Sequence, residues 1–329
     1  MIELVDIETG VDLVDFVPGA SVERDRNGRP KIYSNCMFCI GSGKMPSPKT
    51  GNLIQCKACK GDGFKGKFYS RTTSYIDNLD DKKALQDWKL RTLLEGVRRK
   101  PELLATFAAV EDFNGTGKAQ ADALVEELLD AADAGLKADL GSALHRITED
   151  IDAGQDPGFI PDEFLGDIEA YRIASTDFEH VLIEVFAVLD EFGIAGTFDR
   201  LIRVWGELAR RLGLEPGTLV VGDIKTGGID FARGKIGMQL AAYSRMQSYD
   251  KTTFERGPLT SLGEVNQKVG LIIHMPSGQG VCEVVTVDLE KGWEALQLAR
   301  KVREYRNFWN TKAGKGEIVA TSVSQVVQS

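Results

Sequence analysis

The chain has 329 residues, of which 43% are hydrophobic and 27% are charged. This length and composition are typical of a globular protein with one large domain or two domains. The 40 basic and 49 acidic residues give a net charge of −9, which excludes a uniformly basic surface for nucleic acid. Any polyanion must therefore bind at a local basic patch.

The opening sequence, MIELVDIETGVDLVDF, has neither a basic region nor a continuous apolar run, so we expect no signal peptide. No stretch reaches the roughly 18 to 20 apolar residues that span a bilayer. Five cysteines in such a protein argue against a disulfide framework. We therefore expect a soluble, cytoplasmic protein without a membrane partner.

The predicted elements follow one another in an α/β or α+β order. After a segment at 36–68 that is rich in Gly, Cys and Lys, helical patterns are predicted at 80–100, 101–112, 118–134 and 137–152. Apolar runs then predict strands at 180–189, 193–204, 217–225, 269–275 and 280–289, with helices at 233–248 and 291–309. This order predicts a mixed central sheet flanked by helices. The predicted divisions are an N-terminal segment (1–70) with a small metal module (36–63), a helical lead-in (71–136), a core (137–320) and a loose tail (321–329).

Four cysteines form two C-x2-C pairs, Cys36 with Cys39 and Cys56 with Cys59, with sixteen residues between the pairs. Each pair presents two thiolates from one turn, so two turns supply the ligands of a tetrahedral structural zinc site. An iron–sulfur cluster is the alternative metal centre, and four unrelated reduced cysteines are the other alternative. Cys282 stands alone in a strand-like run and is expected to be a small buried residue.

Each pair continues as C-x-x-C-x-G-x-G, in CMFCIGSG and CKACKGDG. This pattern resembles the zinc-binding repeats of DnaJ-type chaperones. The chain has only two repeats with a long loop between them, so the resemblance does not imply a chaperone function.

Two basic segments contain interleaved aromatic residues, a composition that suits a nucleic-acid backbone and its bases. Solvated surfaces are the alternative for both. In and after the second cysteine pair the basic residues are Lys57, Lys60, Lys65, Lys67 and Arg71. In the closing helix they are Arg300, Lys301, Arg303 and Arg306.

The stretch VVGDIKTGG (220–228) ends a predicted strand with Asp223 and Lys225. Residues i and i+2 of a strand project from one face, so this carboxylate and this ammonium lie together at the strand end. An isolated pair of this kind is typical of a solvated salt bridge, but its neighbours indicate a site. GTFDRL places Asp199 at another strand, and KIGMQLAAYSR places Gln239 and Tyr243 at i and i+4 on one helix face.

Two further polar residues are candidates for the same site. His145, in GSALH, lies at the edge of an apolar helical stripe and is either a core histidine or a ligand. Glu184, in LIEVF, shares a strand face with apolar residues, so its carboxylate needs a partner. It is either a metal ligand or a strand-edge residue.

Together these motifs resemble the PD-(D/E)xK nuclease superfamily, in its RecB-like exonuclease branch. GSALH resembles the motif of the active-site histidine, GTFDR the first-acid motif, GDIKTG the acid-x-lysine motif and QLAAY the Q-x-x-x-Y motif. The resemblance covers residues 137–290, and residues 69–91 resemble the lead-in of RecB-like nucleases from phages of actinobacteria. The chain departs at Phe198, where the first-acid motif often has proline. Its four cysteines all precede the core, unlike those of CRISPR-associated relatives with an iron–sulfur cluster, which favours zinc.

The resemblance implies a restriction-endonuclease-like core and a metal-dependent deoxyribonuclease, of the exonuclease kind, that acts in phage or bacterial recombination, repair or DNA processing. It assigns Asp199, Asp223 and the carbonyl of Ile224 to a Mg²⁺ or Mn²⁺ ion. His145 is a further ligand, and Glu184 is an additional candidate. A hard cation bound by carboxylates suits hydrolysis of a phosphodiester because it lowers the pKa of water and neutralises phosphoryl charge.

The remaining motif residues are implied to act on the substrate. Lys225 would orient the attacking water or stabilise transition-state charge, and Gln239 and Tyr243 would position the substrate or the lysine. The implied partner is single- or double-stranded DNA, together with proteins of recombination or replication. The competing interpretation is a non-catalytic nucleic-acid-binding or scaffold protein, against which the complete set of motif residues argues.

Overall fold

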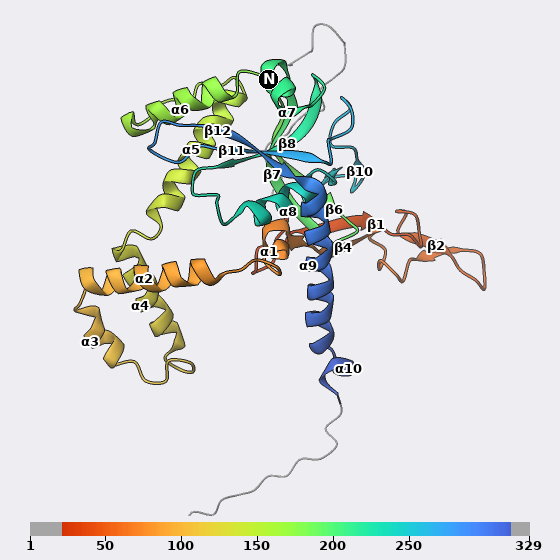
Figure 1. The fold of residues 1–329 in the computed structure, drawn as a ribbon. Helices are drawn as coiled ribbons and strands as arrows, with labels where there is room; N and C mark the ends of the chain where they lie inside the picture. Colours follow the sequence, from red (N-terminus) through yellow and green to blue (C-terminus); the bar gives the residue numbers. More distant parts are fainter. Residues whose placement is uncertain (1–21, 317–329) are drawn as a thin grey trace, which may run out of the picture.

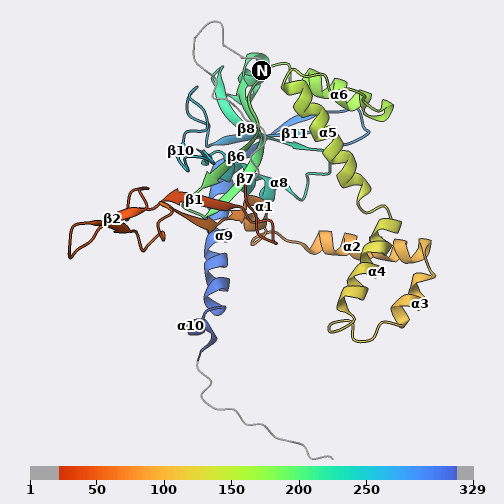
Figure 2. The same ribbon diagram turned by 180° about the vertical axis from the view of Figure 1, so that it is seen from behind.

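The computed structural model describes residues 22–316 (Figures 1 and 2), so the opening segment and the predicted tail at 321–329 lie outside the described residues. Its centre is a mixed sheet of eight strands. Across the sheet the order is β10 (Arg256–Gly257), β9 (Gln247–Tyr249), β6 (Phe178–Leu189), β7 (Ile194–Val204), β8 (Thr218–Lys225), β11 (Val269–His274) and β12 (Glu283–Asp288), and β5 (Ser70–Arg71) also pairs with β7. The pairs β8–β11 and β5–β7 are parallel, and the others are antiparallel.

Helices pack on both faces of this sheet (Figure 1). One face packs against α1 (Thr72–Ile76), α8 (Arg233–Tyr243) and α9 (Leu289–Trp309), and the other against α5 (Leu136–Asp152), α6 (Asp162–Ala174) and α7 (Gly206–Leu212). Alternate residues of β8 divide between the two cores: Leu219 and Val221 join the first, and Val220 and Ile224 join the second. The mixed α/β sheet with flanking helices is therefore confirmed. No helix within residues 22–316 has the length and apolar character needed to cross a membrane.

The predicted strands and helices are present, with one correction, and the structure adds elements that were not predicted. The helix predicted at 233–248 ends at Tyr243, because Gln247–Tyr249 forms β9 and pairs with β6. Helices α6 and α7 were not predicted. α6 begins after Pro161 and buries Phe164, Ile168 and Tyr171 on one face, a helical spacing that the sequence does contain.

An arm formed by residues 31–68 extends from the sheet (Figure 1). It contains β1 (Lys31–Asn35), β2 (Lys44–Pro46), β3 (Leu53–Gln55) and β4 (Phe64–Phe68), in which β1 pairs with β4 and β2 pairs with β3. Ile32 and Tyr69 pack with Val188 of β6 in a small core at its base. The hydroxyl of Tyr249 accepts the backbone N–H of Tyr33 over 2.9 Å, which also fixes the arm to the sheet.

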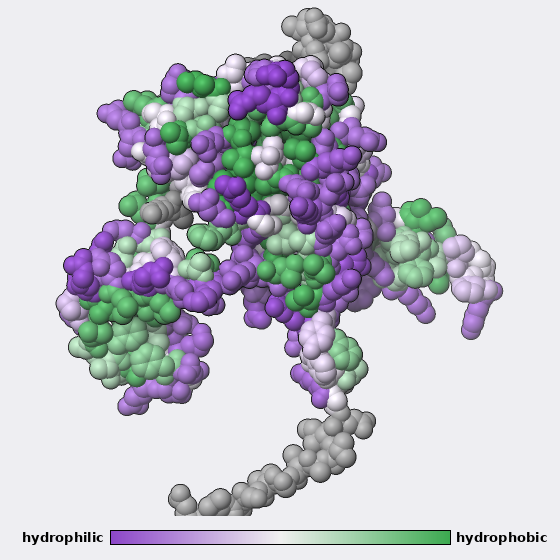
Figure 3. All heavy atoms as spheres, in the orientation of Figure 1, coloured by the Kyte–Doolittle hydropathy of each residue, from purple (hydrophilic) through white to green (hydrophobic). Residues whose placement is uncertain are grey.

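The segment after α1 forms a helical lead-in of α2 (Lys83–Arg99), α3 (Leu103–Ala108) and α4 (Lys118–Ala131). A Cβ at Gly96 would lie 2.0 Å from the carbonyl oxygen of Leu128, so only glycine allows α2 and α4 to approach this closely. Figure 3 shows hydrophobic surface over this segment. Its exposed large apolar residues include Leu85, Trp88, Leu90, Leu94 and Leu104. The C-terminal end of the described chain is α10 (Lys312–Lys315).

A buried ion pair joins four elements on the α5 side of the sheet. Arg200 of β7 is fully buried and donates from Nε to Oδ2 of Asp152, the last residue of α5, over 2.6 Å. Tyr171 of α6 donates to the same oxygen over 2.6 Å, and His180 of β6 lies 3.2 Å from the other oxygen. Arg200 also donates to the backbone carbonyl of Asp199 over 2.9 Å. The pair therefore fixes α5, α6, β6 and β7 against one another.

Replacement of Arg200 by leucine would leave Asp152 buried without its cation. We predict a loss of about 3–5 kcal/mol in the free energy of unfolding, measured by urea denaturation. The control is Arg210→Leu, which removes an exposed ion pair with Glu207 and should cost less than about 1 kcal/mol. Equal losses in the two variants would contradict the central role of the buried pair.

Candidate functional site

The predicted site residues meet where β7 and β8 separate. The antiparallel ladder of these strands ends at the pair Arg200–Gly222. Beyond it, the carboxylate of Asp199 accepts the backbone N–H of Ile224 over 2.9 Å. Beyond the last backbone pair, a side chain of β7 therefore makes the hydrogen bond to the backbone of β8. β8 remains paired in parallel with β11 at this end, so the strand is held on its other side.

Asp223 and Lys225 project from β8 and form an ion pair. Asp223 is 1% exposed, and the side chain of Lys225 is 31% exposed. Burial, followed by the charge of Asp199, raises the pKa of Asp223 to about 7, although the ammonium of Lys225 opposes the shift. Ionisation of this buried carboxylate is therefore unfavourable despite the ammonium of Lys225, and a second cation nearby would stabilise the ionised form.

Helix α8 supplies two further predicted residues to Asp223. Nε2 of Gln239 donates to Oδ1 of Asp223 over 3.2 Å and to the hydroxyl of Tyr243 over 3.4 Å. Burial, followed by the charges of Asp223 and Asp199, raises the pKa of Tyr243, so this phenol stays neutral. The i and i+4 spacing predicted for these residues thus brings both side chains to the end of β8.

Helix α5 brings His145 to the same junction. Its Nδ1 lies 3.7 Å from Oδ2 of Asp199. Burial lowers the pKa of His145, while the carboxylate of Asp199 opposes the shift. The imidazole is therefore neutral at physiological pH, which is the form that can bind a metal.

Glu184 lies on β6 between Ile183 and Val185, which pair with Arg200 and Phe198, the neighbours of Asp199 on β7. Its φ angle is +52°, in the left-handed region that costs a non-glycine residue about 1–2 kcal/mol. Burial, followed by the charges of Asp199 and Glu149, raises the pKa of Glu184 to about 7. Backbone strain at an acidic residue that lies beside other acids is characteristic of functional sites.

Glu149 is a site residue that the sequence analysis missed. It lies one helical turn after His145 on α5, and burial raises the pKa of its carboxyl group. The available signal was the i and i+4 spacing of His145 and Glu149 on a helix already assigned to the site.

An open cleft of about 460 Å³ lies beside these acids. The first turns of α5 lie close to the residue that follows β8, since a Cβ at Gly141 would lie 2.6 Å from the hydroxyl of Thr226. The cleft is lined by Gly141, Ser142, His145, Arg146, Glu149, Glu184 and Thr226.

The side chains at this junction include the donor types that hard divalent cations prefer. Asp199, Asp223 and Glu184 offer carboxylate oxygens, and His145 offers a ring nitrogen. Apart from its ion pair with Lys225, Oδ2 of Asp223 is buried and accepts no hydrogen bond from the described residues. No three of these groups bring their ligand atoms within 4.8 Å of one another, a condition that within residues 22–316 only the four cysteines meet.

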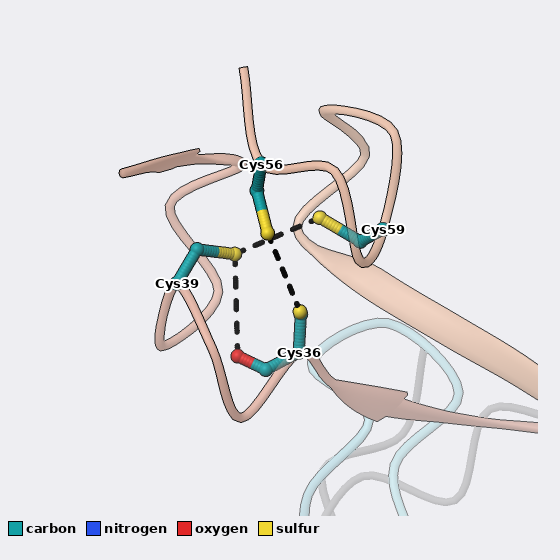
Figure 4. Close-up of side chains that lie close together, drawn as sticks. All are labelled: Cys36, Cys39, Cys56 and Cys59. Carbon is teal, nitrogen blue, oxygen red and sulfur yellow. Dashed lines mark hydrogen bonds between the residues drawn. The ribbon is translucent and has the colours of Figure 1, made fainter. Parts of the chain in front are cut away.

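The four cysteines form a separate candidate metal centre at the arm (Figure 4). All four are buried, and their sulfur atoms all lie within 4.8 Å of one another. The Sγ atoms of Cys36 and Cys56 are 3.9 Å apart, and those of Cys39 and Cys59 are 3.6 Å apart. Such a cluster could hold a metal ion such as zinc, which confirms the predicted metal-binding arrangement of the cysteines.

The geometry of this cluster explains the repeated C-x-x-C-x-G-x-G pattern. The last glycine of each repeat donates its N–H to a thiol: Gly43 to Cys39 and Gly63 to Cys59, each over 3.3 Å. Both glycines of each repeat have positive φ. A Cβ at Gly43 would also lie 2.1 Å from the carbonyl oxygen of Gly61 in the other repeat. The two repeats therefore pack against each other where only glycine fits.

Cys282 lies outside this cluster, just before β12, and is half-buried against the core on the α5 side. Burial raises the pKa of its thiol to about 12, so it behaves as a small, largely apolar side chain.

The basic residues assigned to DNA binding have two different environments. Those of the arm and of β5 are exposed, and the ammonium of Lys65 lies 5.5 Å from the ring centre of Phe38. These residues are Lys57, Lys60, Lys65, Lys67 and Arg71. Their exposure leaves these side chains accessible, and their assignment to DNA binding stays a prediction.

The arginines of α9 instead contact neighbouring parts of the protein. Arg300 forms ion pairs with Glu191 and Glu304. Arg303 donates to the hydroxyl of Ser70 over 2.6 Å, and Arg306 donates to the side chain of Asn78 over 3.1 Å. Their observed contacts hold α9 against α1 and β5, and Lys301 beside them is exposed.

No protein-family model matches the chain, and no curated protein matches it. Function is therefore inferred from the two sites themselves. At the first, Asp199, Asp223, Lys225 and His145 converge from three elements. At the second, four thiols converge from two turns.

Replacement of Cys56 by serine would remove one thiolate ligand from the cluster. We predict that the wild type contains about one zinc ion per chain, and that the variant loses the ion and unfolds at a lower temperature, because metal-binding energy contributes to folding. Elemental analysis and thermal unfolding measure the two effects. Cys282→Ser lies outside the cluster and should retain the metal. Iron, or no metal, in the wild type would contradict the zinc prediction.

The raised pKa of Glu184 predicts a pH-dependent cost to stability when Mg²⁺ and Mn²⁺ are absent. Its carboxyl ionises near its usual pKa of about 4.3 in the unfolded chain but only at about 7 in the folded protein. The folded state therefore loses stability as pH rises through this interval. Because Glu184→Gln removes the ionisation, the stability of this variant relative to wild type should rise by about 1 kcal/mol between about pH 5 and 8.

Denaturant unfolding at several pH values measures this difference. Glu264→Gln, at an exposed position, is the control and should show a difference from wild type that is independent of pH. A pH-independent difference for Glu184→Gln as well would contradict the electrostatic coupling of Glu184 to the other acids.

Proposed function

We propose that this protein is a metal-dependent nuclease that hydrolyses phosphodiester bonds in DNA. The observation that best supports the proposal is the junction of β7 and β8. There Asp199 and Asp223, from neighbouring strands, meet Lys225 and His145 beside an open cleft. Two carboxylates, an ammonium and a neutral imidazole are the groups that metal-assisted phosphodiester hydrolysis needs.

The same residues support a finer description of the fold. We propose that α5, β6, β7, β8, α8 and β11 form a restriction-endonuclease-like core. The motifs that resemble the RecB-like nucleases all lie on these elements: His145 on α5, Asp199 on β7, Asp223 and Lys225 on β8, and Gln239 with Tyr243 on α8. Motifs that are far apart in the sequence thus meet at one end of the sheet.

Asp199 and Asp223 would hold a Mg²⁺ or Mn²⁺ ion, with His145, Glu184 and the carbonyl of Ile224 as additional ligands. Such an ion supplies a lowered pKa for bound water and neutralises charge on the phosphoryl oxygens. The neutral state of His145 suits ligation, and its nitrogen would favour Mn²⁺ alongside Mg²⁺. The raised pKa values of Asp223 and Glu184 fit carboxylates that are stabilised by a nearby positive charge when they ionise.

We assign Lys225 to the reacting groups. Its ammonium contacts Oδ2 of Asp223 yet remains partly exposed, so it reaches solvent and substrate from beside the acids. A compact positive charge there orients a water molecule and stabilises charge that develops on the phosphoryl oxygens. Gln239 holds the other carboxylate oxygen of Asp223, which fixes the orientation of that carboxylate.

Although the chain as a whole is acidic, DNA is the proposed substrate because the arm carries exposed positive charges that can bind a polyanion. Its exposed lysines can bind a phosphate backbone, and exposed Phe38 can stack on a base. This surface would bind the nucleic acid while the β7–β8 junction carries out the chemistry.

A cleavage assay tests the proposal directly. Wild-type protein is incubated with end-labelled single- and double-stranded DNA in the presence of Mn²⁺ or Mg²⁺. Asp223→Asn and Lys225→Ala should each lower the cleavage rate at least about a hundredfold, because they remove a ligand and a charge that stabilises the transition state. Asp230→Asn and Lys268→Ala make the same chemical changes at exposed positions and should leave the rate within about twofold of wild type.

If the wild type cleaved no substrate with any of the metals, the nuclease proposal would be refuted. If DNA binding persisted in that case, the protein would instead be a non-catalytic nucleic-acid-binding protein. Cleavage that is unchanged in Asp223→Asn would place the catalytic centre elsewhere in the molecule.

A further inference from the structure

A second cavity, of about 370 Å³, is lined by residues of β5, α1, β7 and α8 and by the turn that contains Arg24 and Gly28. Its chemistry is opposite to that of the acidic cleft. Two guanidinium groups and four hydroxyl groups line it, and no acidic side chain does so among the described residues. The residues that supply these groups are Arg24, Arg71, Thr72, Thr73, Thr197 and Tyr243.

A tight turn holds both arginines in place. Arg24 donates from Nη1 to the carbonyl of Gly28 over 2.9 Å. The side chain of Arg71 packs against Gly28, whose φ is +71° and whose absent Cβ would lie 3.7 Å from Cδ of Arg71. The acid in this turn, Asp25, is already neutralised by an ion pair with Arg29 over 2.6 Å. The two guanidinium groups therefore retain donors and positive charge for a ligand.

Thr72 is the observation that most clearly points to a ligand. It lines the cavity at 1% exposure, and its hydroxyl oxygen is buried without a well-aligned hydrogen-bond partner among the described residues. A Cβ at Gly196 would lie 2.7 Å from this oxygen, so the glycine keeps the space beside the hydroxyl open. An unsatisfied buried hydroxyl is costly unless something binds it.

We propose that this cavity binds a phosphoryl group of a nucleic-acid strand through Arg24, Arg71 and Thr72. Two guanidinium groups and a hydroxyl supply more donors than a carboxylate accepts, and they match the several oxygens of a phosphoryl group. The fork geometry of arginine suits this ligand.

The position of the cavity connects it to the acidic junction. Thr197 precedes Asp199 by two residues on β7, and the wall residue Tyr243 is hydrogen-bonded to Gln239, which in turn contacts Asp223. A strand held by one phosphoryl group here continues towards the acids. This choice of ligand rests on the proposed nuclease function, whereas the anion site itself rests on the cavity alone.

The first experiment measures inorganic phosphate binding to the full chain by calorimetry, at constant ionic strength set with chloride. The wild type should bind phosphate saturably, and Arg71→Ala should weaken binding at least about tenfold. Arg26→Ala is the matched control, since Arg26 lies in the same turn but does not line the cavity, and it should change binding by less than about twofold.

Thr72→Val removes the buried hydroxyl and keeps the shape of the side chain nearly unchanged. The variant should bind phosphate about threefold to tenfold more weakly than wild type. Its thermal unfolding in phosphate-free buffer should stay close to that of wild type, because the hydroxyl makes no well-aligned hydrogen bond in the folded protein. This second measurement separates a lost ligand contact from a damaged fold.

A second experiment identifies the source of the phosphoryl group. It measures the binding of oligonucleotides to protein that carries Asp223→Asn, so that binding is measured without cleavage. If the site takes a strand end, a terminal phosphate at the 5′ or the 3′ end should increase affinity, and Arg71→Ala should abolish that increase. If it takes an internal phosphodiester, Arg71→Ala should weaken all oligonucleotides equally and by more than Arg26→Ala does.

Two results would overturn the proposal. One is the absence of saturable phosphate binding by the wild type up to about 50 mM. The other is an equal effect of Arg71→Ala and Arg26→Ala on phosphate and on every oligonucleotide. Because neither readout depends on catalysis, phosphate binding by a protein that cleaves no DNA would refute the nuclease proposal alone.

Discussion

The buried pair of Arg200 and Asp152 is the contact on which the candidate active site depends. Arg200 follows Asp199 in β7, and Asp152 ends the helix that carries His145. By binding Asp152 and the backbone carbonyl of Asp199, one guanidinium fixes the distance between that helix and that strand. A buried charge pair is costly to desolvate and gains little stability over apolar packing. The pair instead fits a need to hold α5 and β7 at a fixed distance, since the site contains side chains from both elements.

The second constraint is the separation of β7 and β8 beyond Gly222. Where two strands stay paired, their backbone groups satisfy one another and their side chains point to the two faces of the sheet. Where they separate, Asp199 can turn its carboxylate towards β8 and accept the N–H of Ile224. That contact brings the acid to Asp223 without a loop. Parallel pairing with β11 keeps the end of β8 in place, so the site is built on strands and its geometry is held by the sheet.

The sequence predicted the parts of this structure that follow from local periodicity. Alternation on β8 placed Asp223 beside Lys225, helical spacing placed Gln239 beside Tyr243, and the cysteine repeat predicted a four-thiol cluster. Contacts that depend on register between distant segments could not be predicted. The burial of Arg200 is one example, because arginine is usually exposed and only the arrival of α5 and α6 supplies its partners. Glu184 is another, because nothing in the alternating pattern of its strand indicates the positive φ at which its backbone is held.

The cavity that Arg24 and Arg71 line and the cleft beside the acids differ in charge, and this difference has a consequence for binding order. A nucleic-acid strand carries charge at every phosphate, so cationic Arg24 and Arg71 attract it while Asp199 and Asp223 repel it. Neutralisation of the acids by a divalent cation removes that repulsion. Cation binding and strand binding therefore each strengthen the other, because coupling between two sites is reciprocal. Under the proposed nuclease function, an overall acidic chain would gain selectivity from this arrangement, since a strand would reach the acids with favourable energy only when the cation needed for cleavage is already bound.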